Sequence, residues 1–273
     1  MRSLYVDLPA GRFHCRHWTG PGAGRPPLVL LHGALDSAAT WHRIGPELAR
    51  HAEVFALDQR GHGASPHPPR GHYDFRQAAD DLAAFLRELR LIRPVLIGHS
   101  WGAAVALALA ARANYTPDTS ALSGLVLEEP PSSFASPLLR EFATAGEELM
   151  GLPDHRRATV VRGMSPCHNS AAAEATLDGL RHTTPEIFHS IMADGAAAGD
   201  LLPLLARVTA PVLVLRADPA VRPGIDPLAW GRARRYLPEH GRLAQVPGAD
   251  HTIHHSRTAD YLHALRKFLR TLP

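Results

Sequence analysis

The 273-residue chain has few of the residues that mark secreted, metal-binding or nucleic-acid-binding proteins. Its two cysteines, Cys15 and Cys167, lie far apart and in no metal-ligand spacing, which is typical of reduced, structural thiols. Lysine is almost absent: Lys267 is the only one, and arginine supplies the other basic side chains. No basic cluster is interleaved with aromatic residues, so we do not expect nucleic acid as a partner.

Long apolar stretches are absent as well. The first residues, MRSLYVD, lack the apolar segment of a signal peptide, and no run approaches the length of a transmembrane helix. We therefore expect a cytoplasmic protein with no membrane partner. The formal net charge of +3 is mild. The length suits one large α/β domain with a sizeable core and room for an inserted subdomain.

Short apolar strands alternate with helical segments along most of the chain. Residues 2–8 and 12–18 flank a Pro-Ala-Gly turn and predict an antiparallel hairpin at a sheet edge. Later apolar runs, such as Leu28-Val29-Leu30-Leu31, have no polar alternation and are typical of strands buried on both faces. The pattern predicts an α/β fold: an eight-stranded, mostly parallel sheet with helices on both faces.

The alternation stops between residues 132 and 205. This segment has no strand candidate, only helix-like pieces divided by prolines. A helical insertion after a sheet strand predicts a cap. We therefore divide the chain into a first core part (1–131), a helical cap (132–205) and a second core part (206–273).

One stretch carries the strongest functional signal. An apolar strand ending near residue 97 is followed by Gly98-x-Ser100-x-Gly102 and then by an Ala/Leu-rich helix. A nucleophile on so sharp a strand-to-helix turn has strained backbone angles, so its flanking residues must be small. The turn would raise the Ser100 hydroxyl above the sheet and direct N–H groups of the helix start at the group it attacks. The pattern predicts Ser100 as a nucleophile.

Three further motifs stand at the carboxyl ends of other predicted strands, where an open α/β sheet places its ligands. They are His32-Gly33, Asp58-x-Arg60-Gly61-His62-Gly63-x-Ser65 and Gly248-Ala249-Asp250-His251. Together with the Ser100 elbow, and in this order, they resemble the α/β-hydrolase fold superfamily over nearly the full chain. The resemblance implies a serine hydrolase that needs no metal and no organic cofactor.

The resemblance also implies a base and an oxyanion hole. A serine hydroxyl is a poor nucleophile at neutral pH and needs a base within hydrogen-bond reach. His251 follows the last strand through a Pro-Gly turn and precedes the last helix, where the family keeps its base. The neighbouring His254 and His255 are expected to be solvated. The backbone N–H groups of Ala34 and Trp101 correspond to the family's oxyanion donors.

The third catalytic member departs from the commonest family pattern. That pattern has an aspartate a few residues past the seventh strand, where this chain has Ala220, and Asp218 lies two residues too early. Resorcylic lactone hydrolases and some haloalkane dehalogenases instead take the acid from the end of the sixth strand, where this chain has Glu128 and Glu129. Adjacent strand residues point to opposite faces, so at most one of the two can face His251. We predict Glu129 as the acid, with Asp218 as the alternative.

These assignments predict cleavage of a carboxylic ester or lactone through an acyl-enzyme on Ser100. A helical cap favours a small, largely apolar substrate, with Leu35, Trp101 and Met192 as candidate binding residues. Open alternatives are a thioesterase or amidase, a C–C bond hydrolase and a cofactor-free haloperoxidase-like enzyme. A non-catalytic small-molecule receptor is the alternative of another class. The chain is expected to be a monomer or a homodimer.

Other polar residues have ordinary structural interpretations. Asp58 and Arg60 are expected to brace the loop after the fourth strand, and Asp80-Asp81 to lie on the polar face of a helix. Three histidines of the cap are expected to be solvated or packed: His168, His182 and His189.

Overall fold

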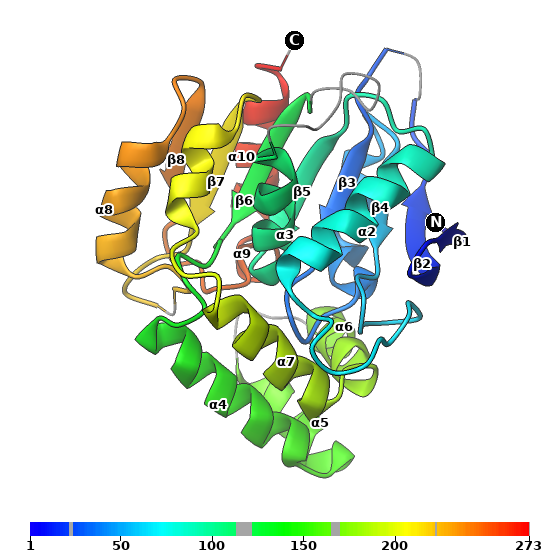
Figure 1. Ribbon diagram of the computed structural model, residues 1–273, viewed down its shortest axis with the longest axis vertical. Helices are drawn as coiled ribbons and strands as arrows, with labels where there is room; N and C mark the ends of the chain where they lie inside the picture. Colours follow the sequence, from blue (N-terminus) through cyan, green and yellow to red (C-terminus); the bar gives the residue numbers. More distant parts are fainter. Residues whose placement is uncertain (22–23, 113–121, 165–169, 222, 273) are drawn as a thin grey trace.

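The computed structural model describes residues 1–21, 24–112, 122–164, 170–221 and 223–272, which form an eight-stranded sheet. Its strands are β1 (Arg2–Leu8), β2 (Gly11–Trp18), β3 (Leu28–Leu31), β4 (Val54–Leu57), β5 (Val95–His99), β6 (Gly124–Glu128), β7 (Val212–Arg216) and β8 (Gly241–Gln245). They lie in the order β1-β2-β4-β3-β5-β6-β7-β8 (Figure 1). β2 is antiparallel to both its neighbours, and every other neighbouring pair is parallel. The predicted fold class is confirmed.

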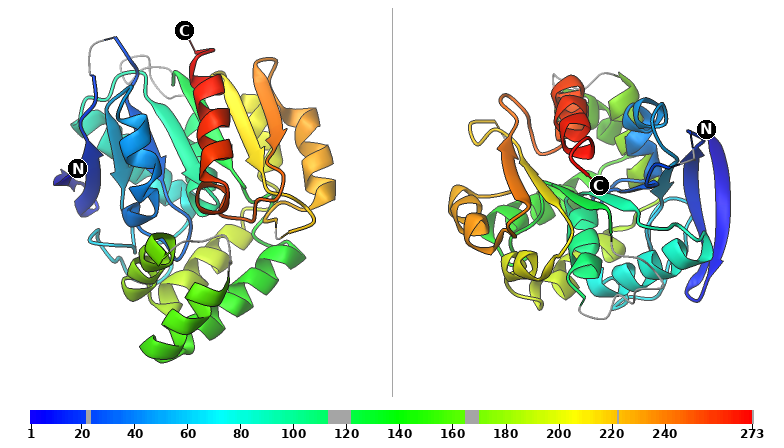
Figure 2. Two further views of the ribbon diagram at one scale, coloured as in Figure 1. Left: turned by 180° about the vertical axis from the view of Figure 1, so that it is seen from behind. Right: turned by 90° about the horizontal axis from the view of Figure 1, so that it is seen from above.

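The central strands are buried on both faces because each is a run of apolar residues. In β6, Leu125 and Leu127 belong to the core on one face and Val126 to the core on the other, as the two-residue period of a strand requires. The first face is covered by α2 (Phe75–Glu88), α3 (Trp101–Ala110) and α8 (Pro227–Tyr236). The opposite face is covered by α1 (Ile44–Leu48) and α10 (Thr258–Leu269) (Figure 2). A polar side chain at the end of β6 therefore has protein on both sides.

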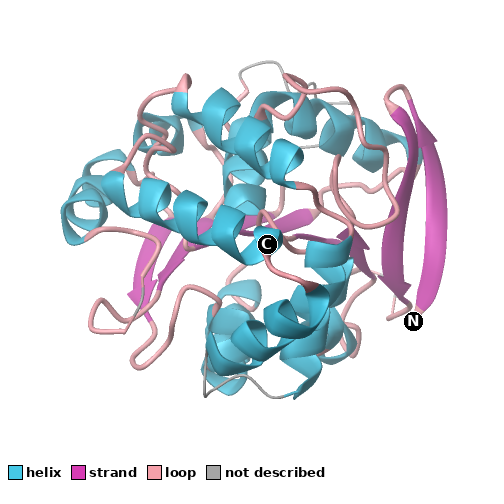
Figure 3. Ribbon diagram, turned by 90° about the horizontal axis from the view of Figure 1, so that it is seen from below, coloured by secondary structure: helices cyan, strands magenta, loops and turns pink. Residues whose placement is uncertain are grey.

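Helices fill the described part of the segment between β6 and β7. They are α4 (Pro137–Gly151), α5 (Asp154–Met164), α6 (Ser170–Arg181), α7 (Pro185–Ala196) and the 3₁₀ helix η3 (Leu202–Arg207). α4 and α7 begin alike: the hydroxyl of Ser136 or Thr184 accepts an N–H group of the first turn, and a proline follows it directly. The four α-helices lie together beyond one end of the sheet (Figure 1). Seen from that end, helices lie in front of the central strands (Figure 3). The division into core and cap at residues 131 and 205 stays a prediction.

The loop after β4 is braced as the sequence predicts. The carboxylate of Asp58 accepts the backbone N–H groups of Ala38 (2.6 Å) and Ala64 (3.1 Å). Arg60 donates to the Asp81 carboxylate through Nε (2.5 Å) and Nη2 (2.8 Å). The expectation that Asp81 lies on the polar face of its helix is wrong. Its side chain is buried, because the guanidinium group of Arg60 replaces water as its partner.

The structure bears on two further expectations, that the cysteines are reduced and that no helix spans a membrane. Cys15 is buried in β2 and forms no disulfide, and burial raises the pKa of its thiol to about 12. Cys167 and His168 lie outside the described residues. Within the described ranges, no helix combines the length and the apolar character that crossing a membrane requires.

Candidate active site

Ser100 stands on the turn between β5 and α3 with a backbone φ of 50° and ψ of −116°. The turn is crowded, as the sequence pattern predicts. A Cβ on Gly98 would lie 2.4 Å from the carbonyl oxygen of Gly102, and a Cβ on Gly102 would lie 2.5 Å from the carbonyl oxygen of His32. Real Cβ atoms do not approach so closely, so both positions require glycine for the strand and helix to pass. The strained elbow therefore exists around Ser100.

Two other residues at this end of the sheet share the unusual backbone. Among the described non-glycine residues, positive φ occurs at Leu35 (72°) after β3 and at Glu129 (50°) after β6, besides Ser100 and two arginines. A non-glycine residue in this region costs about 1–3 kcal/mol, and such residues gather at functional sites. Three neighbouring strands, β3, β5 and β6, are thus each followed by a residue with strained backbone angles at the same end of the sheet.

His251 lies beside Glu129. Its Nδ1 atom is 3.2 Å from Oε2 of Glu129. The carboxylate is fixed by two backbone donors: Oε1 accepts the N–H group of Ala217 (2.7 Å), and Oε2 accepts that of Gly224. With Glu129 almost fully buried, the imidazole is held with Nδ1 toward the acid and Nε2 left for another partner.

The charge of Glu129 changes the basicity of His251. Burial lowers the pKa of His251, but the hydrogen bond to Glu129 and its negative charge outweigh burial and raise that pKa above its ordinary value. The same contact stabilises the imidazolium form that a general base must adopt during proton transfer.

Asp218, the alternative acid, is engaged elsewhere. Its Oδ2 accepts the N–H group of Gly248 (2.8 Å), and its Oδ1 accepts that of Ala220 (2.9 Å). These bonds lower the pKa of Asp218 and tie its loop to the turn that precedes His251. Within the described residues, the structure brings Glu129 to His251 and does not bring Asp218 there.

His99, the residue before Ser100, packs against His251. The ring of His99 lies 4.8 Å from the ring of His251, centroid to centroid. Among the described residues, the hydrogen bonds of the His251 ring include Glu129 and not the Ser100 hydroxyl. Catalytic hydrogen bonds are often long in unliganded sites and tighten when substrate binds.

The predicted oxyanion donors stand on either side of Ser100. Trp101 is the first residue of α3, so its N–H group has no acceptor within the helix. Ala34 lies in a tight turn in which the N–H group of Asp36 donates to the carbonyl oxygen of Gly33 (3.2 Å). A Cβ on Gly33 would lie 3.4 Å from Cβ of Ser100, so this turn packs directly against the nucleophile.

An apolar cluster reaches His251 through Phe142. Leu35 and Met192 belong to one apolar cluster with Phe142 and Phe188. The ring of Phe142 lies 5.9 Å from that of His251. Sequence reasoning missed Phe142, because nothing in a helical aromatic residue tells which loop it will meet. The Trp101 side chain, in contrast, is 1% exposed and packs inward 5.3 Å from His62.

A second histidine–glutamate pair lies behind the first. Glu128 accepts the Nδ1–H (2.8 Å) and the backbone N–H (3.0 Å) of His254. Thr40 Oγ1 lies 3.0 Å from Nε2 of His254 and 2.8 Å from Nε2 of His255. The expectation that His254 and His255 are solvated is wrong, because both are buried and each has a ring nitrogen within hydrogen-bond distance of Thr40.

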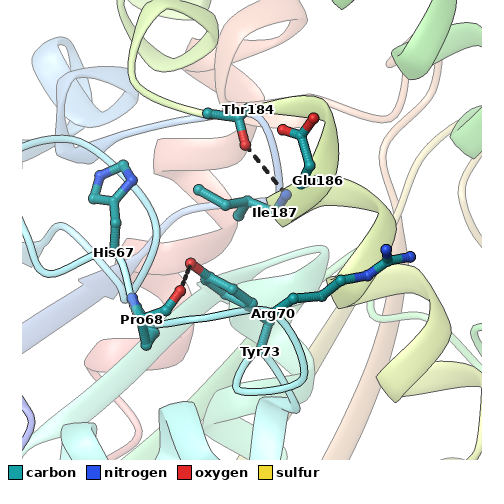
Figure 4. A pocket seen from close by; sticks show the side chains of 7 residues that line it. All are labelled: His67, Pro68, Arg70, Tyr73, Thr184, Glu186 and Ile187. Atoms are coloured by element: carbon teal, nitrogen blue, oxygen red, sulfur yellow. Dashed lines mark hydrogen bonds between the residues drawn. The ribbon is translucent and has the colours of Figure 1, made fainter.

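The described part of the chain contains no group of three or more His, Cys, Asp and Glu side chains arranged to hold a metal ion. A cavity of about 270 Å³ lies between the loop 67–73 and the start of α7 (Figure 4). Its lining residues are His67, Pro68, Arg70, Tyr73, Thr184, Glu186 and Ile187. None of them is a predicted catalytic residue. His182, directly after α6, and His189, in α7, are exposed.

Comparison with known proteins gives the family. The sequence model described as alpha/beta hydrolase fold matches residues 26–258. The chain is 29% identical over 273 residues to 2-(acetamidomethylene)succinate hydrolase of Mesorhizobium japonicum, with 91% of this chain and 89% of that protein aligned. An esterase from Rhodococcus sp. ECU1013 superposes with a TM-score of 0.80 at 23% identity, covering 100% of both chains. The enol-lactonase of Burkholderia xenovorans superposes with a TM-score of 0.78 at 21% identity, covering 98% of this chain and 100% of the other. The chain therefore belongs to the alpha/beta hydrolase fold family and is a hydrolase.

Proposed function

We propose that this hydrolase cleaves a carboxylic ester or lactone of a small, largely apolar molecule, through an acyl-enzyme on Ser100. The observation that carries the proposal is the contact between His251 and Glu129 at the sheet end where Ser100 stands on its strained elbow. A nucleophile, a base and a buried acid that orients the base are the parts that acyl transfer requires.

In the first half of the reaction, His251 takes the proton of the Ser100 hydroxyl as its oxygen attacks the carbonyl carbon. The negative charge that develops on the carbonyl oxygen is stabilised by the N–H groups of Ala34 and Trp101. A single donor of this kind contributes about 3 kcal/mol to transition-state stabilisation in comparable enzymes. The protonated His251 then gives its proton to the leaving alcohol oxygen, and the ester bond breaks.

In the second half, a water molecule replaces the alcohol. His251 takes a proton from the water, whose oxygen attacks the acyl carbon, and the same oxyanion donors act again. Collapse of the tetrahedral intermediate breaks the bond to Ser100, returns the proton to the serine oxygen and releases the carboxylic acid. Glu129 keeps the tautomer and the orientation of His251 constant through both halves.

The choice of an apolar ester or lactone is supported by two observations. Phe142 lies beside His251 and belongs to an apolar cluster with Leu35 and Met192, which favours an apolar acyl or alkoxy group. An esterase and an enol-lactonase are among the structures with the same fold.

Active-site labelling combined with a substrate screen tests the proposal. We expect a fluorophosphonate probe to label wild-type protein at Ser100, and Ser100→Ala to take up none. We also expect turnover of short-chain p-nitrophenyl esters or of lactones, absent in Ser100→Ala. If folded wild-type protein takes up no label, the acyl-enzyme mechanism is wrong. If it is labelled but turns over only thioesters, amides or diketones, the mechanism stands and the substrate class is wrong.

A further inference from the structure

His99, the residue before the nucleophile, lies where the three parts of the candidate site meet. Its side chain is 3% exposed. On one side, its Nε2 atom lies 3.1 Å from the main-chain carbonyl oxygen of His251. The ring itself packs between the rings of His251 and His254, at centroid distances of 4.8 and 5.0 Å. The sequence analysis gave this residue no role.

On its other side, His99 contacts the turn that carries the oxyanion donor. A Cβ on Gly33 would lie 2.8 Å from Nδ1 of His99, so the turn is pressed against the ring. The carboxyl group of Asp36, two residues after Ala34, has Oδ2 at 4.0 Å from the same Nδ1. This buried Nδ1 atom has no hydrogen-bond partner among the described residues. At 4.0 Å the two groups are not hydrogen-bonded, but a small movement of the Asp36 side chain would bring its carboxyl group within reach of Nδ1.

The hydrogen-bond partners determine which nitrogen of His99 carries the proton. A carbonyl oxygen only accepts, so Nε2 must donate to the carbonyl of His251. Burial lowers the pKa of His99 well below its ordinary value, so the ring is neutral and its Nδ1 is an acceptor. Burial raises the pKa of Asp36 to about 7, so below neutral pH most of this carboxyl group carries a proton that it could donate to Nδ1.

We infer that His99 is a positioning residue: its ring fixes the main chain of His251 relative to the nucleophile elbow, and the Asp36 carboxyl group fixes His99. The inference rests on the proposed function, since positioning matters only if His251 acts on Ser100. In this arrangement the base, the nucleophile and the oxyanion turn move as one unit. A small misplacement of a base lowers the rate steeply, so loss of this link slows the chemical step rather than substrate binding.

The link depends on the charge of Asp36. An ionised carboxylate can only accept, so it favours the tautomer with the proton on Nδ1 of His99. Nε2 then faces the carbonyl oxygen of His251 as a second acceptor, and the hydrogen bond is lost. Two charged or titratable groups act on Asp36 directly: positive charge on His251 favours its ionised form, and negative charge on Glu128 disfavours it.

Charged groups also face this link from the surrounding elements. His254 faces His99 from the short helix α9 (Ile253–Ser256), and Glu128 faces it from β6. On the cap side, Asp178 of α6 accepts the hydroxyl of Ser37, the residue after Asp36 (3.0 Å).

Two substitutions at His99 separate a hydrogen bond from simple packing. His99→Gln keeps an N–H donor near the Nε2 position, and His99→Leu fills similar space without one. The matched control is His17→Leu: this half-buried histidine stacks on Phe55, 4.5 Å away, and pairs with Glu53 at the opposite end of the sheet. Each variant is assayed at pH 6.5, below the pKa of Asp36, for the rate of fluorophosphonate labelling at Ser100, and for kcat and KM on a p-nitrophenyl ester.

We expect His99→Leu to lose about ten- to a hundred-fold in labelling rate and kcat with KM little changed. We expect His99→Gln to recover most of the loss, and His17→Leu to match the wild type. Equal losses in the Leu and Gln variants, or no loss in either, overturn the inference. If the wild type itself is not labelled, the proposed function fails instead, so the two failures are distinct.

A third variant reports on the Asp36 contact and remains informative if His99→Leu does not fold. Asp36→Asn keeps a neutral donor of the same shape. We expect its kcat to match the wild type at pH 5 and to exceed it increasingly as the pH rises through about 7, where Asp36 ionises. A ratio of variant to wild type that is constant across this pH range overturns the role of Asp36.

Discussion

The Glu129 carboxylate lies 3.2 Å from Nδ1 of His251, although 122 residues separate them in the chain. Glu129 follows β6 directly and has a positive φ of 50°, so it departs from the regular alternation of the strand. Its neighbour Glu128 keeps the strand conformation and points into the core toward His254. Two adjacent carboxylates thus bind two histidines of the segment between β8 and α10.

The first prediction concerns the acid. Glu129→Gln should reduce kcat on an activated ester by about 10³- to 10⁴-fold, because an amide does not stabilise the imidazolium and favours the wrong tautomer. It should also move the acidic limb of kcat/KM to lower pH, since Glu129 raises the pKa of His251. Asp218→Asn should retain most of the activity. A larger loss of kcat in Asp218→Asn than in Glu129→Gln would make Asp218 the acid.

The strands and the elbow could be predicted because their signals are local. Uninterrupted apolar runs identify strands buried on both faces, and the two glycines around Ser100 report a close approach that only glycine permits. The burial of His254 and Asp81 could not be predicted, because it depends on partners far along the chain, Glu128 and Arg60. From sequence alone a polar side chain is expected to be exposed, because the distant residue that could pair with it inside the protein is not known.

The second prediction concerns the buried pair of Glu128 and His254. Glu128→Leu should lower the free energy of unfolding by about 3–5 kcal/mol, because the N–H groups of His254 lose a buried acceptor. Glu128→Gln keeps an acceptor oxygen and should lose less. Urea unfolding of the two variants and the wild type measures the difference. Equal stability of Glu128→Leu and the wild type would mean that the pair contributes nothing to folding.

The third prediction concerns pH and Asp36. Burial raises the pKa of Asp36 from 3.8 to about 7 in the folded protein. A carboxyl group with a raised folded pKa favours folding below its unfolded pKa, and this contribution is lost as the pH rises toward the folded pKa. Asp36→Asn removes the effect, so its stability relative to the wild type should grow between pH 4 and pH 7, by about 4 kcal/mol at most.

Urea unfolding of Asp36→Asn and the wild type at several pH values measures this difference. Thr144→Ala, which removes a hydroxyl that donates to the main-chain carbonyl oxygen of Arg140 and not to a carboxylate, is the control and should show no such trend. A difference between Asp36→Asn and the wild type that stays constant from pH 4 to pH 8 would show that Asp36 ionises as readily in the folded protein as in the unfolded chain.

The fourth prediction concerns the contact between α6 and the oxyanion turn. A Cβ on Gly179 would lie 2.4 Å from the carbonyl oxygen of Leu35, so Gly179→Ala must push the helix away from the turn or distort the turn. Overpacking of this kind costs about 1–3 kcal/mol of stability. Because Leu35 follows the oxyanion donor Ala34 directly, kcat should fall as well.

Gly231→Ala is the matched control: it adds the same methyl group in α8, where a Cβ meets no atom within 4 Å. That variant should be more stable than the wild type by up to about 1 kcal/mol, with unchanged kcat. If Gly179→Ala has the kcat of the wild type, the position of α6 does not influence the oxyanion turn.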